Sequence, residues 1–293
     1  MNMSCDLMKR YAEDLSLKGY KRRTIQSYVR AVMQLLNYYS KPPEAITEED
    51  VRGYWIFCKE DVGWSAATLR IAYSGVQHFF TFTLKRDWEI LHAVKFERHV
   101  TYPVVLSLDE VRRLLPAACN QANRAFMTLV YGCGLRISEA IQLRVCDIDG
   151  QRMCIHIHQG KGGKDRYVPV AEQTLDIVRD YYRTHRNPVW VFPAHGRSGN
   201  DAGRAQQPVA ISTVQGALRR AVARCDLSKS VHMHTLRHSY ATHMIEAGVP
   251  VRHLQDCLGH ESLASTMIYL HITSHGREES RAKLNQLMRG VVK

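Results

Sequence analysis

The chain has 293 residues, of which 45% are hydrophobic, and it carries a formal charge of +12 with a pI near 9.4. This length predicts about two domains, and the charge favours a polyanionic partner, most commonly nucleic acid. The sequence has no apolar run typical of a secretory signal and none approaching the ~18 residues of a membrane span, so we expect no membrane partner, a cytoplasmic location and reduced cysteines.

The first part of the chain, residues 1–102, is predicted to be a helical domain of about four helices. Apolar residues between Tyr28 and Leu36 recur at helical spacing, and the two prolines that follow end this helix. Thr47 and Ser65 each precede a segment with helical periodicity, so we expect both to be N-caps. No strand pattern interrupts this region.

A linker near Pro103 separates this part from the second domain, residues 103–293. Directly after it, Ser107 and Glu110 form a capping box that predicts the start of a helix. The second part is the more basic one, because residues 100–293 hold 25 Lys and Arg against 16 Asp and Glu. We therefore expect most of the contacts with a polyanion in this domain.

The second domain has a mixed pattern. One helix is predicted to end at Gly132, and another restarts at Arg136. Residues 154–158 and 166–168 alternate with period two on either side of a Gly- and Lys-rich turn, which predicts a β-hairpin with a basic tip. Helical spacing returns after Thr235. The fold class is therefore predicted to be mainly α with a small β-sheet.

Two arginines have the chemistry of a phosphate clamp. A guanidinium is planar and always charged, and it donates to two phosphate oxygens at once. Arg136 follows two glycines that allow close backbone approach, and Arg237 lies three residues after His234 on one helix face. Glu139 either orients Arg136 or forms an ordinary i,i+3 pair with it.

A tyrosine downstream of these residues, Tyr269, is the candidate nucleophile. A phenol has a pKa near 10, so only about one in a thousand is ionised at pH 7, and adjacent cations favour the ionised form. His234 and His260 are placed to move a proton or to donate to a phosphate oxygen. His238 and His243 are expected to be structural.

When a phosphodiester is cleaved, a general acid protonates the oxygen that leaves the phosphorus, and we expect this acid at the tip of the hairpin. Lys161 and Lys164 are both candidates, and their spacing alone does not separate them. His156 and His158 would point to one side of a strand, but the sequence has neither an H-E-x-x-H motif nor paired carboxylates at two-metal spacing. We therefore expect neither a metal site nor a cofactor.

These residues together resemble the signature of the tyrosine recombinases, also called the phage integrase family. The signature consists of an arginine in G-L-R-x-S-E, a lysine in G-K-G, then H-x-L-R-H, L-G-H and a tyrosine nine residues later. The chain matches it in type, order and spacing at Arg136, Lys161, His234, Arg237, His260 and Tyr269.

The resemblance implies a site-specific DNA recombinase that works without metal or ATP. Tyr269 would attack a DNA phosphodiester and form a 3′-phosphotyrosyl link, while Arg136 and Arg237 hold the non-bridging oxygens. Lys161 would protonate the leaving 5′-oxygen. Residues 1–102 would be a core-binding domain and residues 103–293 the catalytic domain, ending in a helix that packs on a neighbouring subunit. Four protomers would assemble on double-stranded DNA with paired core sites.

The subgroup implied is Xer-like, integron-like or transposon-borne, because the chain is compact and shows no additional arm-binding domain. Two other functions share this fold or chemistry. One is a non-catalytic DNA-binding regulator, which the intact set of six residues disfavours. The other is a type IB topoisomerase-like enzyme, which would relax supercoils without exchanging paired sites.

Overall fold

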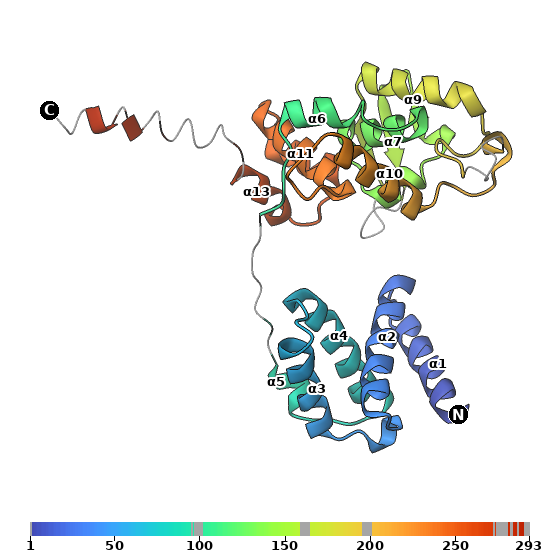
Figure 1. The fold of residues 1–293 in the computed structure, drawn as a ribbon, viewed down its shortest axis with the longest axis vertical. Coiled ribbons are helices and arrows are strands. Elements are labelled where there is room, and N and C mark those ends of the chain that lie inside the picture. Colours follow the sequence, from blue (N-terminus) through green and yellow to red (C-terminus); the bar gives the residue numbers. More distant parts are fainter. Residues whose placement is uncertain are drawn as a thin grey trace. The chain divides into compact units, whose positions relative to one another are not determined.

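The computed structural model divides the chain into two compact units, residues 1–101 and 102–293 (Figure 1). The residues that it describes are 2–94, 96, 102–158, 165–194, 201–271 and 273, with 281, 284, 285 and 287–289 of the C-terminal tail. Each unit has a hydrophobic core of its own. Helices dominate both units and one small sheet lies in the second, which confirms the predicted fold class.

The first unit is helical throughout its described residues. Its elements are α1 (Asn2–Leu17), α2 (Arg22–Tyr39), η1 (Pro43–Ala45), α3 (Glu48–Glu60), α4 (Ala66–His78), the π-helical turn η2 (Phe79–Thr83) and α5 (Ile90–Ala93). The two predicted N-caps are confirmed, because Thr47 Oγ1 accepts from the Asp50 N–H at 3.1 Å and Ser65 Oγ from the Thr68 N–H at 3.3 Å. These side chains satisfy amide groups that have no partner within the helix.

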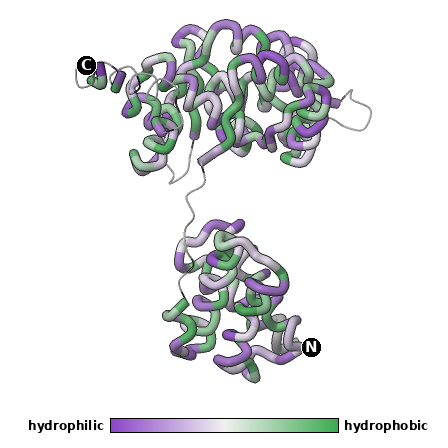
Figure 2. Tube along the Cα trace, turned by 60° about the vertical axis from the view of Figure 1, so that its left-hand side comes forward, coloured by the Kyte–Doolittle hydropathy of each residue, from purple (hydrophilic) through white to green (hydrophobic). Residues whose placement is uncertain are grey.

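Close packing of α2 against α4 organises this unit. A Cβ atom added to Gly75 on α4 would lie 2.9 Å from Tyr28 Cα on α2, so a side chain here would force the two helices apart. The hydroxyl of Tyr11 on α1 donates to the Gly75 carbonyl at 2.7 Å, which fixes α1 against the packed helices α2 and α4. Along these helices apolar and polar residues alternate, as expected when one face is buried (Figure 2).

The second unit contains eight α-helices among its described residues. They are α6 (Leu108–Leu114), α7 (Gln121–Gly132), α8 (Ile137–Ile141), α9 (Glu172–His185), α10 (Ile211–Arg224), α11 (Met233–Glu246), α12 (Val251–Leu258) and α13 (Ala264–Leu270), with the 3-10 turns η3 (Val145–Asp147) and η4 (Ala202–Arg204). The capping box predicted for α6 is confirmed: the Ser107 N–H donates to Glu110 Oε2 at 2.7 Å, and the Glu110 N–H donates to Ser107 Oγ at 3.2 Å.

A three-stranded antiparallel sheet lies in this unit, with the order β1 (Ile148–Asp149), β2 (Cys154–Ile157) and β3 (Arg166–Pro169). Residue 154 of β2 pairs with residue 169 of β3, which confirms the predicted hairpin. The sequence analysis did not predict β1, because two residues are too few to show a period of two. The tip of the hairpin, with Lys161 and Lys164, lies outside the described residues.

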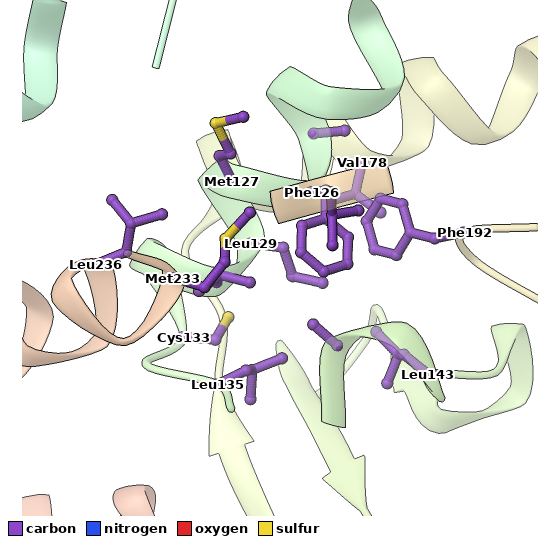
Figure 3. Close-up of a cluster of buried hydrophobic side chains, with 14 of the residues drawn as sticks. Phe126, Met127, Leu129, Cys133, Leu135, Leu143, Val178, Phe192, Met233 and Leu236 are labelled. Carbon is purple, nitrogen blue, oxygen red and sulfur yellow. The ribbon is translucent and has the colours of Figure 1, made fainter. Parts of the chain in front are cut away.

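Helix α7 forms the centre of the second core (Figure 3). Phe126 packs edge-on against Phe192 with ring centroids 5.0 Å apart, and Met233 and Leu236 reach the same cluster from α11. Full burial of such a side chain contributes about 1.5–3 kcal/mol. The core thus fixes α11, which carries part of the predicted site, against the turn after α7.

The C-terminal tail contributes a small apolar stripe. Leu284, Leu287 and Met288 are helical and exposed, as the helical spacing of these residues predicts. Within the described part of the chain, no helix combines the length and the apolar character that a bilayer span requires.

Candidate active site

Arg136 stands at the N-cap of α8, directly after the turn that ends α7. This turn depends on Gly134, which has a φ of +59°. A Cβ atom added there would lie 2.3 Å from Cδ1 of Tyr240 on α11. Because glycine has no side chain, it can adopt the left-handed backbone and also lets α11 pack closely against the turn. The turn thereby brings the Arg136 side chain next to α11.

Arg237 lies on α11 and is almost fully buried, with 3% of its surface exposed. Its Nη1 donates to the Gly134 carbonyl at 2.7 Å, and its Nη2 donates to the Leu258 carbonyl at 2.6 Å. Burial, and then the charge of Arg136, lower the pKa of this guanidinium to about 10. The side chain therefore remains charged at neutral pH and is held in one orientation by backbone oxygens.

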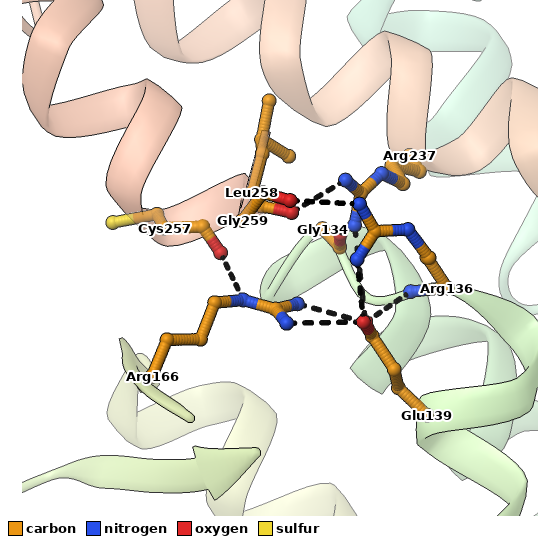
Figure 4. A network of polar contacts seen from close by, with 8 residues as sticks. All are labelled: Gly134, Arg136, Glu139, Arg166, Arg237, Cys257, Leu258 and Gly259. Carbon is orange, nitrogen blue, oxygen red and sulfur yellow. Dashed lines mark hydrogen bonds and ion pairs between the residues drawn. The ribbon is translucent and has the colours of Figure 1, made fainter. Parts of the chain in front are cut away.

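The end of α12 supplies further anchors for arginines (Figure 4). Arg136 Nη2 donates to the Gly259 carbonyl at 2.9 Å, and Arg166 Nε donates to the Cys257 carbonyl at 2.8 Å. The last carbonyls of a helix lack partners within it and carry a partial negative charge, so cations are favoured there. Gly259 ends the helix with a φ of +61°, which explains the glycine of the L-G-H motif.

Glu139 connects these arginines. Its carboxylate accepts from Arg136 Nη1 at 2.6 Å and from the Arg136 backbone N–H at 2.8 Å. It also accepts from Arg166 Nη1 and Nη2, at 3.0 and 2.7 Å. Burial alone would raise the pKa of this carboxyl, but the hydrogen bonds and charges of Arg166 and Arg136 outweigh it and lower the pKa to about 2. Glu139 is thus a permanent anion that orients Arg136, the first of the two roles that its spacing allowed.

The sequence analysis missed Arg166. This residue opens β3, and its side chain is 9% exposed and forms a two-pronged ion pair with Glu139. An arginine at a strand end has no periodic signal, because its partners on α8 and α12 lie far away in the sequence. Only the folded hairpin brings it to the site.

Tyr269 on α13 is buried with 2% of its surface exposed, and it faces two histidines. Its Oη lies 2.9 Å from His238 Nδ1, and its ring stacks on that of His260 with centroids 6.3 Å apart. His260 Nδ1 in turn lies 2.9 Å from Thr266 Oγ1. Burial raises the pKa of the Tyr269 phenol, although the charges of Arg237 and Arg136 lower it in part. The phenol is therefore protonated at neutral pH.

The three histidines of the site are neutral. Burial, and then neighbouring positive charges, lower the pKa of His238 and of His260 to about 4. The pKa of His234 is lowered by the same causes, burial first. A neutral His238 protonated at Nε2 accepts the hydrogen bond of the Tyr269 hydroxyl through Nδ1, whereas the other tautomer donates to the phenol oxygen.

Five of the six predicted site residues lie in one cluster, and the sixth, Lys161, lies outside the described residues. His238, which was expected to be structural, has its Nδ1 2.9 Å from the Tyr269 hydroxyl, a contact that the sequence did not predict. His243 lies beside Tyr131 instead, with Nδ1 2.9 Å from the hydroxyl. Neighbouring sequence could not reveal the His238 contact, because α11 and α13 are separated by α12.

Comparisons with known proteins identify the family of the chain. The signature of the phage integrase family matches residues 104–275, and that of its N-terminal SAM-like domain matches residues 7–90. A Sinorhizobium fredii protein provisionally named integrase/recombinase y4qK is 38% identical over 92% of this chain and 85% of its own. Tyrosine recombinase XerA of Pyrococcus horikoshii is 29% identical over 98% of this chain and 97% of its own.

Among solved structures, a lambda integrase dimer bound to a COC′ core site has the same fold. It superposes with a TM-score of 0.72 at 18% identity and covers 90% of this chain and 94% of that one. The crystal structure of XerA recombinase is 28% identical, with a TM-score of 0.54, and covers 96% and 98% of the two chains. The chain therefore belongs to the phage integrase family, the family of the tyrosine recombinases.

Proposed function

We propose that this chain cleaves and rejoins double-stranded DNA at specific sites, with Tyr269 as the nucleophile. The Tyr269 oxygen forms a bond to the phosphorus of a DNA phosphodiester, and the bond from phosphorus to the 5′-oxygen breaks. The products are a 3′-phosphotyrosyl ester and a 5′-hydroxyl. Attack by the 5′-hydroxyl of a second strand reverses the step. The ester conserves the energy of the broken bond, so the exchange needs neither ATP nor a metal.

The observation that carries this proposal is the pair of anchored arginines beside a buried tyrosine. The hydrogen bonds described for Arg136 and Arg237 use one N–H on each Nη atom, of the five in a guanidinium. The remaining N–H groups would donate to the two non-bridging oxygens of a phosphate. Donors fixed in advance act most strongly where negative charge grows in the transition state, and each is worth roughly 3–4 kcal/mol of barrier.

We assign proton transfer and further phosphate contacts to the other three of the six signature residues, Lys161, His234 and His260. Lys161 protonates the leaving 5′-oxygen, a role that rests on its match to the family signature. His234 serves as acid and base, and His260 donates to the phosphate. The phenol proton of Tyr269 must leave during attack, and the neutral Nδ1 of His238 is the acceptor that it already contacts. This concentration of matched groups disfavours a non-catalytic regulator.

We assign DNA-site binding to the first unit and catalysis to the second. Residues 1–102 would contact the core site and residues 103–293 would perform catalysis. The exposed stripe of Leu284, Leu287 and Met288 suits a helix that packs on a neighbouring subunit. Four protomers on two sites would then exchange strands, as expected of an enzyme that moves a mobile element or resolves replicon dimers in the bacterial cytoplasm.

A nicked suicide substrate tests the proposal. Duplexes tiled across the DNA that flanks the gene are incubated with the protein in EDTA, and each carries one nick that lets the short fragment with the new 5′-hydroxyl diffuse away after cleavage. We expect a covalent adduct on one duplex, with the phosphate mapped to Tyr269 by mass spectrometry. Tyr269→Phe should bind that duplex and form no adduct. Tyr102→Phe, at an exposed tyrosine, is the matched control and should react normally.

Two results would refute the assignment. One is an adduct that persists in Tyr269→Phe, and the other is a phosphate mapped to a different side chain. Relaxation of a supercoiled plasmid without recombinant products would instead indicate a topoisomerase-like activity.

A further inference from the structure

Beside the candidate active site, the β2–β3 hairpin brings two histidines and an aspartate together. His156 and His158 lie two residues apart and so project from the same face of the sheet. Asp165 directly precedes β3 on the other arm of the hairpin. One ligand atom from each of the three residues lies within 4.8 Å of the other two.

The distances match the coordination sphere of a small transition-metal ion. Asp165 Oδ2 lies 3.2 Å from His156 Nε2 and 3.5 Å from His158 Nδ1. Nitrogen and oxygen ligands bind such an ion at about 2.0–2.2 Å, which places tetrahedral neighbours roughly 3.3–3.6 Å apart. The 3.5 Å distance lies within this range, and the 3.2 Å distance is just below it.

A buried carboxylate fixes the tautomer of His158. Its Nε2 lies 3.0 Å from Oδ1 of Asp147, whose side chain is only 7% exposed. Since a carboxylate only accepts hydrogen bonds, Nε2 carries the proton, and in the neutral ring Nδ1 carries a lone pair. Histidine ligands of metals usually donate their second nitrogen to a carboxylate in this way.

The lone pair of His158 Nδ1 consequently faces another acceptor, Asp165 Oδ2. Two facing acceptor atoms repel each other unless a proton or a cation lies between them. The ring of His156 lies beside the same atoms, with its centroid 3.9 Å from that of His158. A cation would relieve both contacts at once.

The site is also oriented and accessible. The ring of His156 stacks on Tyr167, with centroids 4.5 Å apart and planes inclined by 12°, which limits its rotation. The three residues line a cavity of about 760 Å³ together with Asp147 and Glu139. This cavity has room for water or another ligand at a remaining coordination position.

We propose that His156, His158 and Asp165 bind one divalent first-row transition ion, such as Zn²⁺ or Co²⁺. Two imidazole nitrogens and one carboxylate oxygen are a donor set that these ions prefer over Mg²⁺ or Ca²⁺. The ion would bridge the two arms of the hairpin, outside the cluster of Arg136, Arg237 and Tyr269. The sequence predicts no metal site here because it contains neither an H-E-x-x-H motif nor paired carboxylates at two-metal spacing, and Asp165 joins the two histidines only in the folded hairpin.

Titration with Co²⁺ tests the proposal, because this ion gives a visible spectrum that reports its ligands. The full-length protein is stripped with EDTA, dialysed and titrated, and Zn²⁺ is then added as a competitor. We expect one Co²⁺ per chain at this site, no thiolate charge-transfer band, and displacement by Zn²⁺. His156→Ala and His158→Ala should each weaken binding at least tenfold, and Asp147→Asn about 10–100-fold.

His92→Ala is the matched control, because His92 lies 2.7 Å from Asp87 in an exposed pair that lacks a second histidine. This variant should bind Co²⁺ like the wild type. Asp147 also accepts a hydrogen bond from the Arg144 backbone N–H, so Asp147→Asn can disturb the fold as well as metal binding. The two histidine variants therefore decide the outcome, because the His156 and His158 side chains are partly exposed. Unchanged Co²⁺ binding in the double variant His156→Ala/His158→Ala, with a native circular dichroism spectrum, would overturn the proposal, as would a wild type that binds no Co²⁺.

Discussion

Replacing Glu139 with glutamine removes the anion that links Arg136 to Arg166 and leaves the shape of the side chain unchanged. Its pKa falls from 4.5 to about 2 in the folded chain. Since each tenfold change in acidity corresponds to about 1.4 kcal/mol, ionised Glu139 contributes roughly 3 kcal/mol to the stability of the second unit at neutral pH. Removing one partner of a buried ion pair typically costs about 3–5 kcal/mol, in agreement with this value.

The pH dependence of this loss follows from the direction of the shift. A carboxyl whose pKa is depressed by folding stabilises the protein above the pKa of the unfolded chain, and this contribution is lost as the pH falls through the folded pKa. The difference between wild type and Glu139→Gln should therefore be complete at pH 7. It should begin to shrink below about pH 4.5 and disappear near pH 2.

Urea titration with pulsed hydrogen exchange and mass spectrometry measures this difference for each unit separately. Peptides from α7 report on the second unit, and peptides from α2 report on the first and serve as an internal reference. Glu172→Gln, an exposed substitution in the first turn of α9, is the matched control and should change stability by less than about 0.5 kcal/mol. A loss in Glu139→Gln below about 1 kcal/mol at pH 7, or one that does not shrink in acid, would refute the reasoning.

Two further predictions concern the same unit. Gly134→Ala places a Cβ atom 2.3 Å from Tyr240 Cδ1 on a left-handed backbone, and it should lower the stability of the second unit by about 2–4 kcal/mol. Gly248→Ala, with a φ of +86° and no atom within 4 Å, should lower it by only about 1 kcal/mol. Equal losses of stability in the α7 peptides would contradict the steric clash with Tyr240. The pKa values of His238 and His260 are about 4, below the ordinary 6.5, so the unfolded chain takes up protons that the folded chain does not, and stability should fall as the pH drops from 6.5 to 4. His238→Gln should flatten this fall by up to roughly 3 kcal/mol, and an unaltered pH profile would show that His238 is not buried in its neutral form.

The parts of the fold that the sequence predicted are those with local signals. Thr47, Ser65 and Ser107 mark helix starts because a capping side chain bonds an amide only three residues away. Gly259 marks a helix end because the left-handed turn there favours glycine over other residues. The hairpin was predicted from alternation along two short segments, which is equally local.

The parts that escaped prediction depend on contacts between distant segments. Arg166 reaches Glu139 only when β3 lies beside α8, and His238 meets Tyr269 only when α13 returns to α11. The π-helical turn Phe79–Thr83 has no sequence signal of its own, because its hydrogen-bond pattern depends on tertiary packing. For the candidate site, the sequence therefore predicted five residues that the structure brings together, and Glu139 beside Arg136, but neither Arg166 nor the contact of His238 with Tyr269.

The arginines of the site are held largely by oxygen atoms of the main chain. Arg237 bonds the carbonyls of Gly134 and Leu258, and Arg166 bonds that of Cys257. No point substitution deletes a carbonyl, so the identity of residue 257 can drift between homologues while Arg166 keeps its acceptor, whereas Leu258 is a fully buried residue of the L-G-H motif. What such drift must preserve is the path of the backbone, and selection should therefore act most strictly on the glycines that bend it.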